Sequence, residues 1–134
     1  MSLAYVLTPF LAWLVAGSLK FVINSIKAGR PAFGLIGYGG LPSNHSAIVS
    51  SMVALIGFRE GINDPAFGVA LTVAFIVMLD ASSLRKQVGK QAAVINRLAE
   101  EGAVLRERMG HTSLEIAAGV FVGCVVGYAV SLLC

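Results

Sequence analysis

Long runs of apolar residues, separated by short polar segments, dominate the chain. Residues 1–19 carry no charged side chain. At about 1.5 Å per residue, this run approaches the ~20 residues that a bilayer crossing needs. The pattern predicts four membrane-spanning helices, at about 3–26, 43–59, 64–80 and 112–133.

One strongly polar stretch, Asp80 to Gly110, separates the last two of these helices. Within it, apolar residues from Leu84 to Leu98 recur at helical spacing, and basic residues lie off this stripe. Such a pattern is typical of an amphipathic helix that lies at the membrane surface. We expect this interfacial helix at about 81–100.

Glycine interrupts one segment and marks another. Residues 31–42 are too rich in Gly and Pro for a helix. Gly119, Gly123 and Gly127 recur every four residues along the last predicted span. A ladder of small residues of this kind allows close helix packing in a membrane.

Composition agrees with a membrane protein. Of the 134 residues, 57% are hydrophobic and 13% are charged, whereas soluble domains average about 25% charged residues. We therefore expect one all-α, integral membrane domain covering residues 1–134. No basic residue precedes the first apolar run, so this run does not resemble a cleaved signal peptide and we expect it to remain as a span.

The charges predict an orientation. Nine of the ten Lys and Arg lie in residues 20–44 and 80–110, on one side of the predicted bundle, and the turn 59–64 holds only one. By the positive-inside rule, that side is cytoplasmic, in a cell inner (plasma) membrane. The basic residues are not interleaved with aromatic residues, so we expect membrane lipids as partners and no nucleic acid.

The predicted helices also bring a chemically coherent set of side chains to that side. His45 and His111 each begin a helix, and a helix N-terminus binds anions through its free N–H groups. Two histidines suit phosphate chemistry, because one can attack phosphorus while the other protonates the departing oxygen. The full set is Lys20, Lys27, Arg30, Ser43, Asn44, His45, Asp80, Arg85, His111 and Glu115.

This chemistry requires no metal and no other cofactor. Two histidines and scattered carboxylates also fit dedicated metal-ligand spacings poorly. A nearby carboxylate would instead hold the attacking imidazole in its correct tautomer.

Three sequence blocks carry a family resemblance: GGLPSNHSA, LDASSLRKQVGKQAAVIN, and GHTSLE followed by an apolar span. In this order they resemble the divergent branch of the type-2 phosphatidic acid phosphatases, often labelled acid phosphatase or vanadium-dependent haloperoxidase-related. The resemblance covers the chain from Lys20 to Gly123. It implies metal-independent hydrolysis of a lipid phosphate or pyrophosphate.

By that resemblance, His111 would be the nucleophile that forms a phosphohistidine, Glu115 would orient it, and His45 would be the general acid. Asp80 is a further candidate for the catalytic set. The candidate phosphate-binding residues are Lys20, Arg30, Ser43, Asn44 and Arg85.

Several positions depart from the wider superfamily's motifs. Asn44 replaces the usual Gly, and Glu115 replaces Asp. Nine residues rather than six separate Lys20 from Arg30, and no Ser-Arg pair precedes His111 at the expected spacing. Arg85 is a candidate for the missing cation. The superfamily's lipid phosphatases commonly work on the outer face, whereas the charges here place the site inside.

Structural roles remain open for several of these residues. His45 alone is compatible with an interfacial histidine, Asp80 and Arg85 with a helix-end ion pair, and Glu115 with a capping box headed by Thr112. The alternative function is a non-catalytic membrane protein that binds or transports an anionic lipid or anion. A structural subunit or homo-oligomer is a third possibility, favoured by the small size and the glycine ladder.

Overall fold

The structure is a computed structural model that describes residues 3–35, 39–99, 102 and 104–134. Throughout these ranges the regular elements are helical, which confirms the all-α class. Residues 36–38 of the predicted glycine-rich loop, and residue 100 at the predicted end of the amphipathic helix, lie outside the described residues. The elements are α1 (Ala4–Ala28), η1 (Phe33–Leu35), α2 (Asn44–Arg59), α3 (Pro65–Ser82), α4 (Leu84–Leu98) and α5 (Ser113–Leu133).

Local capping signals explain where three of the helices begin. The Ser43 side chain accepts a hydrogen bond from the backbone N–H of Ser46 at the start of α2, and Asp64 caps α3 in the same way. Thr112 caps α5 in a capping box. Side-chain oxygens at these positions satisfy N–H groups that have no partner within the helix. The observed starts therefore lie close to the predicted ones.

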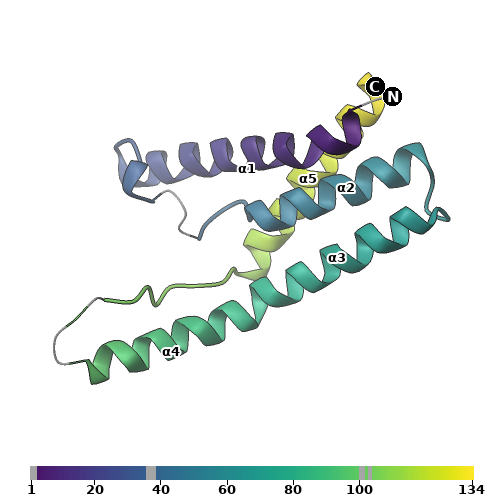
Figure 1. Ribbon diagram of the computed structural model, residues 1–134. Helices are drawn as coiled ribbons and strands as arrows, with labels where there is room; N and C mark the ends of the chain where they lie inside the picture. Colours follow the sequence, from purple (N-terminus) through teal and green to yellow (C-terminus); the bar gives the residue numbers. More distant parts are fainter. Residues whose placement is uncertain (1–2, 36–38, 100–101, 103) are drawn as a thin grey trace.

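The helices form a bundle with α2 at its centre. Helix α2 packs against α1, α3 and α5. In Figure 1, α1, α2 and α3 lie alongside one another, and the two chain ends lie close together at one end of the bundle. Helix α4 continues beyond the bundle from the end of α3, with a break at Ser83. Residues 104–112 then return toward the bundle beside α4 (Figure 1).

The closest packing joins α2 and α5 along the predicted glycine ladder. A Cβ atom on Gly119, Gly123 or Gly127 would lie 2.4, 2.3 or 2.4 Å from the carbonyl oxygens of Ser43, Ala47 and Ser51, respectively. Contacts advance by four residues along both helices at once, so the two helices run parallel. The absence of side chains at these three positions is what permits the approach.

The exterior of the bundle is strongly apolar. Its fully buried positions hold mostly small residues, with Leu55 the largest. Phe10, Phe75, Phe121 and Leu132, in contrast, are more than half exposed. In water such a surface would drive association, whereas in a bilayer it faces hydrocarbon.

Within the described ranges, three stretches are long and apolar enough to cross a membrane: α1, α5, and α3 together with α4 over Pro65–Leu98. Helix α2 has 16 residues, about 24 Å at the helical rise, which is less than the ~30 Å hydrocarbon core of a typical bilayer. A fourth crossing by α2, and the position of α4 at the membrane surface, stay predictions.

Candidate functional site

The N-termini of α2 and α5 meet at one end of the bundle. The backbone N–H of Ser43 donates to the carbonyl oxygen of Glu115, with an N···O distance of 2.9 Å. Next to this bond, Gly119 allows the two backbones to approach. The segments bearing the two histidines, which are far apart in sequence, are thereby joined directly.

His111 lies just before α5 and is held at two points. Its side chain is 10% exposed, and its Nδ1 lies 3.0 Å from Oε2 of Glu115. Its backbone N–H donates to the carbonyl oxygen of Ala81 at the end of α3, at 3.0 Å. When Nδ1 carries the proton in the bond to the carboxylate, Nε2 keeps its lone pair for attack.

The Glu115 side chain contacts both the first turn of α5 and the imidazole of His111. Its Oε2 accepts the backbone N–H of Thr112 at 3.0 Å, and the Thr112 hydroxyl accepts the backbone N–H of Glu115 at 3.2 Å. This reciprocal pair is the capping box expected from the sequence. The same oxygen also contacts the imidazole of His111, so capping does not prevent Glu115 from contacting this histidine.

Residues 104–110, which lead to His111, pack against α4 and hydrogen-bond to it. The Asn96 side chain donates to the carbonyl oxygen of Leu105 at 2.7 Å and accepts its N–H at 2.8 Å. Gly89 lies so close to this segment that a Cβ there would stand 2.2 Å from the carbonyl oxygen of Glu107. Asn96 therefore holds this segment against α4 through backbone atoms.

His45 lies in the first turn of α2 and is exposed. The charged groups that interact with it electrostatically are those of Arg85, His111, Lys20 and Asp80. Charged groups from α1, from the junction of α3 and α4, and from the start of α5 therefore act on the His45 imidazole.

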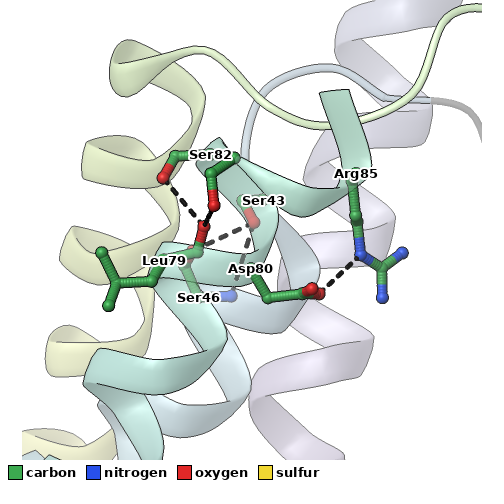
Figure 2. A network of polar contacts seen from close by, with 7 residues as sticks. Ser43, Ser46, Leu79, Asp80, Ser82 and Arg85 are labelled. Atoms are coloured by element: carbon green, nitrogen blue, oxygen red, sulfur yellow. Dashed lines mark hydrogen bonds and ion pairs between the residues drawn. The ribbon is translucent and has the colours of Figure 1, made fainter. Parts of the chain in front are cut away.

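Asp80 and Arg85 form the helix-end ion pair that the sequence suggested. The Arg85 Nε lies 3.1 Å from the Asp80 Oδ2 (Figure 2). Both side chains are partly exposed, at 34% and 40%. Because both act on His45, the pair belongs to the surroundings of the site as well as to the end of α3.

Ser43 and Asn44 differ in what they can offer a ligand. Ser43 is fully buried, and its hydroxyl accepts from the hydroxyl of Ser46 at 3.0 Å (Figure 2). It therefore acts chiefly as the cap of α2. The Oδ1 of Asn44 is buried and has no hydrogen-bond partner in the part of the chain that the structure describes.

Two cavities open beside these residues. A largely apolar groove of about 620 Å³ runs along α1 and reaches Lys20 and Asn44. A more polar cavity of about 280 Å³ is lined by Lys27, Arg108 and Glu115, among others. Asn24 lines both cavities, so they adjoin.

The polar cavity contains two basic residues, Lys27 and Arg108, that were not among the phosphate-binding residues predicted from sequence. Lys27 belongs to the set predicted on this side of the bundle, whereas Arg108 does not. A signal was nevertheless present, because Lys20, Asn24 and Lys27 are spaced four and three residues apart on one face of a helix. Arg30, in contrast, is exposed beyond the end of α1 and lines neither cavity.

The described residues contain no group of three or more His, Cys, Asp or Glu that could hold a metal ion. Metal independence stays a prediction, which a chelator can test.

Comparison with known proteins decides the family. The profile described as the Divergent PAP2 family matches residues 1–126. The chain belongs to the Divergent PAP2 family. It is also 28% identical, over 140 residues, to the uncharacterized membrane protein YuiD of Bacillus subtilis (strain 168), with 90% of this chain and 89% of that protein covered. No solved structure matches the chain. Membership in the Divergent PAP2 family confirms the resemblance seen in the three sequence blocks and identifies a PAP2-related membrane protein.

Proposed function

We propose that this protein is a phosphatase that removes phosphate from a membrane lipid phosphate or diphosphate, without a metal, through a phosphohistidine at His111. The observation that carries the proposal is the His111–Glu115 pair, whose Nδ1 and Oε2 atoms lie 3.0 Å apart. This pair lies at the end of the bundle where α2 begins with His45 in its first turn. A binding protein would need cations for an anion, but it would not need an imidazole held by a carboxylate beside a second imidazole.

The reaction divides into two steps. In the first, Nε2 of His111 attacks phosphorus, the bond from phosphorus to the lipid oxygen breaks, and His45 donates a proton to that oxygen. In the second, His45 takes a proton from water, which attacks the phosphohistidine and releases inorganic phosphate. The sum is one lipid phosphate and one water converted to one lipid alcohol and one phosphate.

Cations around the two imidazoles would stabilise the negative charge on the transferring phosphoryl group. Lys20 and Arg85 interact electrostatically with Glu115 and His45, respectively, and are therefore close to the reacting groups. Lys27 and Arg108 line the adjoining polar cavity. We propose this second pair as binding groups for the remainder of an anionic headgroup.

Phosphate release tests the function directly. Detergent-purified protein should release phosphate from at least one member of a panel containing phosphatidate, phosphatidylglycerophosphate and a polyprenyl diphosphate. Release should persist in EDTA, because the proposed chemistry needs no divalent ion. The measurement is inorganic phosphate against time, with and without EDTA.

Two results would contradict the proposal. Release that EDTA abolishes and Mg²⁺ restores would indicate a metal-dependent reaction. A folded protein that binds these lipids but releases no phosphate from any of them would favour the alternative, a binding or transport protein.

We further propose that the site faces the cytoplasm of a cell whose plasma membrane holds the protein. A cysteine replacing Asn63, between α2 and α3, should then react with a membrane-impermeant thiol reagent in intact cells. A cysteine replacing Lys90, on α4, should react only after lysis. Both belong in a background with Cys124 and Cys134 replaced by Ser, since these native thiols are free and exposed. The reverse labelling pattern would place the site outside.

A further inference from the structure

The groove along α1 is the largest cavity described above, and the proposed phosphoryl transfer leaves most of it unused. It occupies about 620 Å³, within the range of small-molecule sites in proteins. Most of its lining is apolar, from Trp13, Leu14, Phe21 and Phe33, with Gly17 among them. Such a lining offers nothing to a phosphate and suits a hydrocarbon.

The length of the groove matches one leaflet of a bilayer. From Trp13 to Asn24, its lining residues extend over eleven residue steps of α1, or about 16 Å at the helical rise. Half of a ~30 Å hydrocarbon core is about 15 Å. A lipid chain from the leaflet on the site's side therefore has a path that begins near the headgroup level and ends near the midplane.

The polar end of the groove opens at the candidate site. Lys20, Asn24 and Asn44 line this end, and Lys20 interacts electrostatically with Glu115. Asn44 directly precedes His45 and keeps its buried Oδ1 free of any partner in the described part of the chain. The apolar path thus leads to the groups proposed to carry the chemistry.

We propose that the groove holds one hydrocarbon chain of the lipid substrate and that Gly17, which has no side chain, keeps the groove open for this chain beside Asn44. This inference rests on the proposed function, because the phosphate of the same molecule would lie at the Lys20 end. Gly17 is suited to the role, since a Cβ there would meet only the Asn44 Nδ2, at 3.8 Å. An Ala would fit at ordinary contact distance, whereas a Leu would extend into the groove.

The test compares Gly17→Leu with Gly68→Leu. Gly68 lies in α3, where an added Cβ would meet nothing within 4 Å, so it controls for a larger side chain on a membrane helix. For a dioleoyl lipid phosphate, Gly17→Leu should lower kcat/KM by about tenfold or more, and Gly68→Leu should leave it within about twofold.

A substrate without hydrocarbon chains separates chain binding from damage to the site. With glycerol phosphate, which has no chain to place in the groove, Gly17→Leu should change kcat/KM by less than about twofold. An equal loss on both substrates would overturn the inference, because the substitution would then act through Asn44 or the fold. Unchanged turnover of the long-chain substrate would overturn it as well.

Binding keeps the inference testable if no phosphate is released. Trp13 is the protein's single tryptophan and lines the groove, so a lipid phosphate with brominated chains should quench its fluorescence saturably. Gly17→Leu should weaken this quenching, and Gly68→Leu should not. That pattern without turnover would support the groove while refuting the phosphatase. Equal quenching in both variants, or by a brominated lipid without phosphate, would overturn the groove's assignment to this substrate.

Discussion

Replacing His111 with Ala should lower phosphate release by about 10³-fold or more while leaving the protein folded and able to bind lipid phosphate. The expected loss is large because His111 would form the covalent intermediate, and a cation cluster cannot replace a nucleophile. Steady-state release from the lipid that the unaltered protein turns over gives the measurement. Thermal unfolding in detergent, followed by circular dichroism, checks the fold.

His45→Ala distinguishes the roles of the two histidines. Loss of a general acid costs about 10²- to 10⁴-fold when the leaving group needs a proton. It should cost much less with p-nitrophenyl phosphate, whose leaving group departs without one, and His111→Ala should not recover on that substrate. If both variants lose activity equally on both substrates, the division of roles is wrong.

Glu115→Gln separates the two functions of the carboxylate. Gln at this position still forms a capping box, so the melting temperature should change little. It lacks the charge that stabilises an imidazolium and fixes the tautomer of His111, so turnover should fall strongly. Unchanged turnover would show that Glu115 is only the cap of α5.

Gly123→Ala should destabilise the folded protein, by about 1–3 kcal/mol, even though it adds a single methyl group. The new Cβ would stand 2.3 Å from the carbonyl oxygen of Ala47 and 2.9 Å from the Cβ of Ser50. Because one of these atoms belongs to the backbone, a side-chain rotation cannot relieve the contact. Helices α2 and α5 would have to separate.

Gly68→Ala is the matched control, with the opposite expected sign. It makes the same chemical change in a membrane helix, but no atom lies within 4 Å of the added Cβ. Ala favours a helix over Gly by about 0.5–1 kcal/mol, so this variant should be slightly more stable. Melting temperatures in one detergent give the comparison. Equal shifts in both variants would contradict the packing described for α5.

The helices were predictable because their signals are local. Apolar runs predicted the long helices, and the capping box headed by Thr112 marked where α5 begins. The spacing of Gly119, Gly123 and Gly127 predicted close packing, but it did not predict that the partner is α2 or that the two helices run parallel. The partner and the direction depend on which helices lie next to each other in the folded chain.

Part of the candidate site was also predictable from sequence. Both histidines and Glu115 were found from short blocks, and the structure brings them together. The cations were harder, because a cavity wall collects residues from several elements: Lys27 and Arg108 meet only when residues 104–112 fold back along α4. Asn96 acts on backbone atoms of Leu105, and no side-chain pattern encodes such a contact.

The glycine contacts between α2 and α5 also fix the position of one helix along the other. Each helix begins at one of the two histidine segments, and the glycines fix how far one helix is shifted along the other. A slip by one helical turn would displace the segments by about 5.4 Å, enough to break the bond between Ser43 and Glu115. The contacts deep in the bundle therefore set the distance between the two imidazoles at its end. The proposed joint action of the histidines would depend on this distance.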